Sequence, residues 1–208
     1  RFQLSRGFRN LGHLRQLQNE LEEAIKWFSK ATDEERRLVD EEPLISEYRG
    51  DLGTYSNFLA ELLIEQGNIA ERPEYFERAA KHLNEALAMN QELTLRNPND
   101  LLAISALAHT YVCLARLATT ENASRVGEHI EMSRKQFSHL TNPTAADLYQ
   151  QAVAEALSAG LVDTDKTTPT TSSERHREAR MNESLSLLSQ AVIKSRFTIL
   201  PRLVRDPA

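Results

Sequence analysis

The stretch RNLGHLRQLQNELEEAIKWFSKAT, residues 9–32, decides the fold because small and aromatic residues stand in it at helical separations. Gly12, Ala24 and Ala31 are small, and Phe28 is the bulky residue among them. We interpret this pattern as two antiparallel helices in close contact, with Gly12 facing Ala24 and Phe28 filling the space beside them. A large residue at position 24 would push the helices apart, and overpacking of that kind costs about 1–3 kcal/mol.

Apolar residues recur at helical spacing along most of the chain, and no stretch favours strands. Pro43, Gly67 and the segment NPND at 97–100 are expected to end helices. The Thr/Ser-rich segment 162–173 is predicted to be a flexible loop. The predicted helices are 21–42, 45–66, 73–96, 101–119, 124–140, 144–160 and a last helix that ends near residue 194.

An internal repeat is the strongest feature of the sequence. The positions of the second helix recur after 55 residues, and those of the first helix recur twice after 48. The residues of this repeat are Leu11, Gly12, Ala24, Phe28, Ala31, Leu59, Ala60, Ala79, Leu83, Ala86, Leu107 and Ala108. A repeated helix pair predicts a helical solenoid, in which each pair buries its apolar face against the next.

These residues resemble the tetratricopeptide (TPR) repeat. The matching positions are Phe8, Leu11, Gly12, Ala24, Phe28, Ala31 and Pro43. Pro43 and Pro98 come about two turns later than in that family, so the second helices are expected to be extended. The resemblance implies an all-α fold, a right-handed superhelix of antiparallel helix pairs, as a single domain over 1–208. The pairs are expected at about 1–43, 44–98, 99–142 and 143–208.

A narrower likeness lies at the C-terminal end. The segments DLYQQAVAEAL and ESLSLLSQAVIKSRFTILPRLVRDP resemble the closing part of the repeat region of bacterial serine/threonine protein kinases. This implies a non-catalytic TPR arm of such a kinase, cut from a longer chain that begins upstream of Arg1. A free-standing TPR adaptor is the alternative. The expected location is the cytoplasm, although a kinase of this sort can be anchored in a membrane.

The sequence offers little catalytic chemistry. It contains no glycine-rich phosphate loop and no His-Arg-Asp or Asp-Phe-Gly motif. The six histidines show no zinc-binding spacing, so neither a metal nor another cofactor is predicted. Cys113 and His109 share a helix face, which leaves a thiol enzyme as a second alternative. We expect a protein that is not an enzyme.

Composition limits the possible partners. The chain of 208 residues has a formal net charge of −5, and its middle part is acidic, which argues against a nucleic-acid-binding protein. No apolar run of membrane-spanning length is expected. The resemblance implies instead a protein or peptide partner in a groove lined by the first helices. The groove candidates are Arg6, Arg9, His13, Gln16, Asn57, Glu61, Glu65, Ser105, His109 and Gln150, with a basic end at positions 6, 9 and 13.

Overall fold

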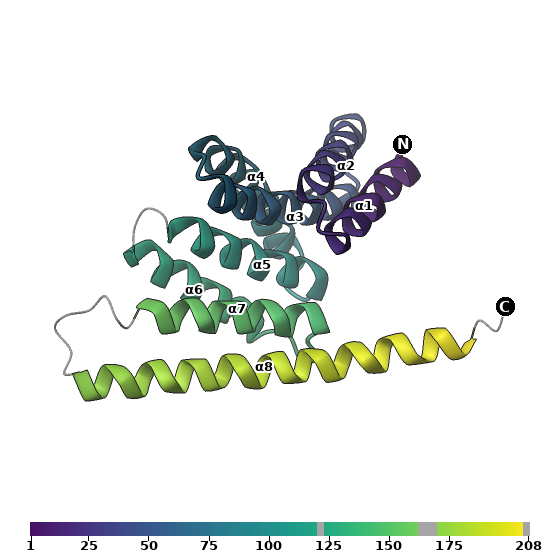
Figure 1. The fold of residues 1–208 in the computed structure, drawn as a ribbon. Helices are drawn as coiled ribbons and strands as arrows, with labels where there is room; N and C mark the ends of the chain where they lie inside the picture. The colour runs from purple at the N-terminus through teal and green to yellow at the C-terminus, as the bar shows by residue number, and fades with distance from the viewer. Residues whose placement is uncertain (120–122, 162–169, 206–208) are drawn as a thin grey trace.

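The computed structural model describes residues 1–119, 123–161 and 170–205, and every element in these ranges is an α-helix (Figure 1). The helices are α1 (Phe2–Leu17), α2 (Leu21–Glu41), α3 (Ser46–Ala70), α4 (Pro73–Arg96), α5 (Leu101–Ala118), α6 (Ala123–Phe137), α7 (Ala145–Leu161) and α8 (Thr170–Arg205). The predicted all-α fold is therefore confirmed.

The helices pack as four successive pairs. The closest contacts are within α1–α2, α3–α4, α5–α6 and α7–α8, and each pair also packs against the next through α2–α3, α4–α5 and α6–α7. The first helices touch one another as well, α3 against α5 and α5 against α7. This arrangement is a stack of helix pairs, an α-solenoid, with connections between pairs at 42–45, 97–100 and 138–144.

Helix lengths follow the prediction in the first two pairs only. Helices α2 and α4 have 21 and 24 residues and are extended, whereas α6 has 15. The predicted end of α3 at Gly67 is wrong, because the helix continues to Ala70. A Cβ atom on Gly67 would lie 2.7 Å from Cε1 of Phe76, so this glycine makes room for an aromatic ring and does not end the helix.

The C-terminal helix is longer than predicted. Helix α8 runs over 36 residues to Arg205, past the predicted end near residue 194, and extends beyond the stack (Figure 1). Of the predicted loop 162–173, residues 162–169 lie outside the described residues, and the last four belong to α8. Thr and Ser cost only about 0.5 kcal/mol each in a helix, so a Thr/Ser-rich composition alone is a weak signal for a loop.

The repeat residues form the core, with one exception. All of them are buried except Leu11, which is 37% exposed, whereas the equivalent Leu59 and Leu107 are 1% and 4% exposed. Those two leucines pack in one apolar cluster between neighbouring helix pairs. Leu11 lies on α1, which packs on α2, whereas Leu59 and Leu107 lie on α3 and α5, each of which packs against neighbouring helix pairs as well as its own partner.

Gly12 permits a close contact between α1 and α2. A Cβ atom at Gly12 would lie 2.6 Å from Cδ2 of Phe28, so the ring of Phe28 rests directly on the backbone of α1. Phe28 was predicted to fill the space beside Gly12, and its ring lies nearest to the place that the missing side chain leaves. The pairing of Gly12 with Ala24 stays a prediction.

Helix α5 is by length and composition alone apolar enough to cross a membrane, contrary to the expectation from the sequence. It is also the central helix of the stack, with 72% of its residues buried. A core helix between two layers has this composition for the same reason as a membrane helix, because it is apolar on most sides.

Candidate functional site

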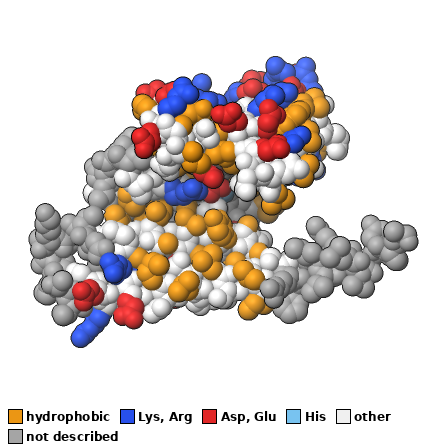
Figure 2. Space-filling view, in the orientation of Figure 1, with side chains coloured by type: hydrophobic (Ala, Val, Ile, Leu, Met, Phe, Trp, Pro, Cys, Tyr) orange, Lys and Arg blue, Asp and Glu red, His pale blue; other side chains and the backbone are white. Residues whose placement is uncertain are grey.

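A groove lined by the first helices of the pairs contains a cavity of about 620 Å³. Helices α1, α3, α5 and α7 contribute most of its wall, with additions from α4 and α6. Five predicted groove residues line it: Arg6, Asn57, Ser105, His109 and Gln150. Figure 2 shows charged side chains gathered over α1–α4 and hydrophobic side chains over the lower part of the stack, around α7 and α8.

The remaining predicted groove residues lie elsewhere. Gln16 and Glu65 are exposed and do not line the cavity. The guanidinium of Arg9 lies 5.8 Å from the centre of the Tyr55 ring. His13 is half-buried between the rings of Phe28 and Phe58, each with its centre 4.9 Å away. Glu61 belongs to a buried cluster described below.

The predicted basic end of the groove is wrong. Burial, and then the charge of Arg9, lower the pKa of His13, so its imidazole is neutral at neutral pH. Arg6 is neutralised by Glu47, with Nη2 to Oε1 at 2.9 Å, and also lies 3.6 Å from Asp51. The cavity wall carries one guanidinium against four carboxylates, those of Glu47, Asp51, Asp100 and Asp147. The groove is therefore acidic.

Two of these carboxylates also hold the ends of helices. Asp100 accepts hydrogen bonds from the backbone N–H groups of Leu102 and Ala103, which caps α5. Asp147 accepts from the Ser105 hydroxyl and from the Thr144 hydroxyl, which joins the start of α7 to α5. Glu47 and Asp51, on the first turns of α3, are consequently the carboxylates that face the groove without a capping role.

Asn57 was predicted to face a ligand, but its side chain serves packing instead. It is fully buried, and its Nδ2 donates to the carbonyl oxygen of Ala106 over 3.0 Å. Its Oδ1 accepts from the Thr110 hydroxyl, and Asn90 Nδ2 donates to the same hydroxyl over 3.1 Å. These bonds tie α3, α4 and α5 together behind the groove.

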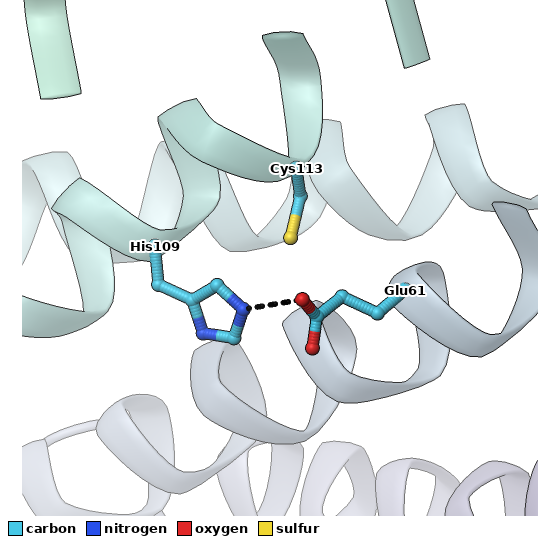
Figure 3. Close-up of side chains that lie close together, drawn as sticks. All are labelled: Glu61, His109 and Cys113. Atoms are coloured by element: carbon cyan, nitrogen blue, oxygen red, sulfur yellow. Dashed lines mark ion pairs between the residues drawn. The ribbon is translucent and has the colours of Figure 1, made fainter. Parts of the chain in front are cut away.

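A buried polar cluster lies where α3, α5 and α7 meet (Figure 3). Oε1 of Glu61 accepts from Arg116 Nη1 at 3.0 Å and from Gln150 Nε2 at 3.2 Å. His109 Nε2 lies 3.3 Å from the same oxygen, at ion-pair distance. Cys113, one turn after His109 on α5, is fully buried and points toward the pair. The side chains of Glu61 and His109 are only 16% and 13% exposed.

Mutual charge decides how this cluster ionises. Burial favours the neutral form of Glu61, but His109, Arg116 and Gln150 outweigh it and lower the pKa of the carboxyl to about 2. Burial likewise favours neutral His109, yet the acidic neighbours raise its pKa. Burial raises the pKa of the Cys113 thiol, so the sulfur is protonated at neutral pH. At neutral pH the cluster therefore holds an ionised Glu61 carboxylate with two cations beside it, the Arg116 guanidinium and the protonated His109, next to the neutral thiol of Cys113.

The repeat itself explains why these side chains meet. Positions 13, 61 and 109 are separated by 48 residues each, so His13, Glu61 and His109 occupy equivalent places on α1, α3 and α5. The ring of Phe58 joins the two histidines, 4.9 Å from His13 and 5.7 Å from His109. Arg116, two turns after His109 on α5, was missed because it is not the repeat equivalent of Glu61 and meets it only through the packing of α5 on α3.

Comparison with known proteins gives a match among solved structures only. No family model matches the chain, and no curated protein matches it. Among solved structures, it is similar to a thermophilic TPR protein of Thermus thermophilus, with 17% identity and a TM-score of 0.42. That match covers 96% of this chain and 95% of the other.

Proposed function

We propose that this chain is a protein-interaction scaffold that binds an extended peptide in the groove of α1, α3, α5 and α7. The observation that carries this proposal is the cavity of about 620 Å³, whose wall combines apolar side chains with polar groups from successive repeats. A wall of this kind suits a peptide, because pockets receive its side chains while polar groups fix its backbone.

The charge of the groove favours a basic peptide. Four carboxylates stand against a single guanidinium that is already paired. Complementary charge guides association and excludes wrong partners, since a like charge brought to this wall would be repelled. In place of the basic end predicted at positions 6, 9 and 13, we therefore propose an acidic groove that takes a peptide with lysine or arginine.

A selection from a displayed library of random linear peptides tests this function, with affinities of the selected peptides measured by fluorescence anisotropy. We expect basic peptides whose affinity falls with salt. Glu47→Lys should weaken them about tenfold, and its side chain is 58% exposed, so folding should be unaffected. Glu65→Lys, exposed and outside the groove, is the matched control. Selection of acidic peptides, or of none, would contradict the proposal.

We also propose that the scaffold is the non-catalytic arm of a cytoplasmic bacterial serine/threonine kinase. The two segments that carry the likeness pair with each other as α7 and α8, and Leu148, Ala152, Leu187 and Ala191 form their shared apolar cluster. Phe197 and Leu203 lie in α8, and Asp206 and Pro207 lie outside the described residues. Sequencing the complete gene tests the link. A kinase domain before Arg1 is expected, and its absence would favour a free-standing adaptor.

A non-catalytic role is part of the same proposal. Cys113 is fully buried, and burial raises the pKa of its thiol, whereas a nucleophile needs an accessible thiolate. Alkylation at neutral pH should be slow in the native protein and fast in denaturant. Rapid native alkylation would instead support the thiol enzyme built on Cys113 and His109.

A further inference from the structure

We propose that Glu61, His109 and Cys113 form a binding site for a divalent transition metal ion, with zinc as the ion that the ligand set fits best. The three residues offer a carboxylate oxygen, an imidazole nitrogen and a sulfur, the donor types that zinc takes in proteins. The chain was expected to bind no metal because these residues have no recognisable spacing. His109 and Cys113 share a face of α5, and only the packing of α3 against α5 brings Glu61 to them.

The ligand atoms are close enough to converge on one ion. One atom from each residue lies within 4.8 Å of the other two, and His109 Nε2 lies 3.3 Å from Glu61 Oε1. Two ligands bound tetrahedrally to zinc at about 2.0–2.3 Å lie roughly 3.5 Å apart. The nitrogen–oxygen pair already meets that separation, and rotation of side chains brings the sulfur in.

The site has a route of entry and an available fourth position. His109 and Gln150 both line the cavity, so an ion in the groove reaches the imidazole without any helix moving. Gln150 is 8% exposed, its Nε2 donates to Glu61, and its Oε1 has no hydrogen-bond partner. His109 Nε2 likewise has none of hydrogen-bond geometry. A bound ion would use this unsatisfied bonding capacity.

Arg116 competes with the metal ion for Glu61. Its Nη1 lies 3.0 Å from the oxygen that the ion would use, so binding requires the guanidinium to move to the other carboxylate oxygen or toward solvent. Binding also releases the thiol proton of Cys113 to solvent, together with any proton on His109. Affinity should therefore rise with pH and should rise further when Arg116 is replaced.

Cobalt(II) titration of the reduced, metal-free 208-residue protein tests the site by absorption spectroscopy. Because Cys113 is the only cysteine, a thiolate-to-cobalt charge-transfer band in the near ultraviolet can arise only from this residue. We expect that band at one equivalent, intense visible bands of tetrahedral cobalt, and loss of both when zinc is added. Absence of the charge-transfer band at mildly alkaline pH in excess cobalt would overturn the proposal.

Variants identify the other ligands. His109→Gln and Glu61→Gln should each weaken cobalt binding at least about tenfold. Arg116→Gln should strengthen it, which a merely adventitious thiolate complex would not show. His139→Gln, an exposed imidazole outside the cluster, is the control and should leave the titration unchanged. Circular dichroism checks that each variant is folded. If the band persists unchanged in His109→Gln and Glu61→Gln, the assigned site is wrong.

Discussion

Glu35 in the first helix pair and Glu61 between the second and third pairs are both withdrawn from solvent, but their surroundings differ. Glu35 is fully buried, accepts one hydrogen bond from Ser5 over 2.5 Å, and its other oxygen has no hydrogen-bond partner. Glu61 accepts from Arg116 and Gln150 and lies beside His109. Burial is common to both sites, so the neighbouring side chains decide whether each carboxyl group is charged or neutral.

The pKa values of the two carboxyl groups consequently shift in opposite directions. Burial raises the pKa of Glu35 to about 7, and the Ser5 hydrogen bond offsets only part of this. At Glu61, neighbouring cations overcome burial and lower the pKa to about 2. One repeat architecture therefore holds a carboxyl that prefers to be neutral and another that is held charged.

The largest loss of stability is expected from placing a new carboxylate without a partner in the apolar core. Ala24 is fully buried, so Ala24→Glu places a charge in the apolar core and should cost about 4 kcal/mol or more. Chemical denaturation measures the loss. Lys26→Glu, on the exposed side of the same helix, is the control. A melting temperature within a few degrees of the wild type would contradict the packing of α2 against α1.

Removing the charged carboxylate of Glu61 should cause the next largest loss in the free energy of unfolding. Glu61→Ala leaves the half-buried Arg116 without its partner and should cost about 3 kcal/mol, whereas exposed Glu65→Ala should change stability by less than about 0.5 kcal/mol. Because the folded pKa lies below the ordinary 4.5, this stabilisation is present above pH 4.5 and is lost as the pH falls toward 2. Urea denaturation at several acidic pH values should show a flatter pH dependence in Glu61→Gln.

Glu35→Gln should act in the opposite pH range and more weakly. A raised folded pKa means that the protonated carboxyl stabilises the protein below pH 4.5, and that this contribution is lost as the pH rises through about 7. The neutral amide should therefore stabilise the protein by about 2 kcal/mol at pH 8 and very little at pH 4. Melting temperatures of Glu35→Gln and the wild type, measured from pH 4 to pH 8, test this prediction. An equal effect at both pH values would contradict the raised pKa.

Gly12→Ala changes the packing of the first helix pair without changing any charge. It should have the smallest effect on the free energy of unfolding. The new methyl group would meet the Phe28 ring at 2.6 Å, which costs about 1–3 kcal/mol, while the gain in helix propensity returns about 1 kcal/mol. A net loss of about 1 kcal/mol, independent of pH, is expected in urea denaturation. Gly7→Ala, where nothing lies within 4 Å of the added atom, should be stabilising.

The repeat made the core predictable. Leu59, Ala60, Leu107 and Ala108 are buried because their spacing fixes which side of each helix meets its neighbours, and spacing is visible in a sequence. The distance of each contact was less predictable. How closely the Phe28 ring approaches the backbone at Gly12 depends on how two helices are offset along their axes, and a sequence does not contain that offset.

The candidate site was harder to predict than the fold. Asn57 lies on the side of α3 that lines the cavity, as predicted. Its side chain is nevertheless bonded to α5, because the distance between neighbouring helix pairs, which a sequence does not contain, decides whether a residue on that side is covered. The basic end was wrong because Glu47 and Asp51, far from Arg6 in sequence, neutralise it. The meeting of Glu61 with Arg116 and Cys113 is likewise a product of tertiary structure.

The burial of Cys113 has a practical consequence. A thiol reagent is much larger than a metal ion, so it can reach the buried sulfur only when α5 separates from its neighbours, and the rate of labelling reports how often that happens. The labelling rate of Cys113 therefore measures the transient separation of the central helices. Any bound molecule that holds these helices together should lower the labelling rate, whatever the chemistry of that molecule.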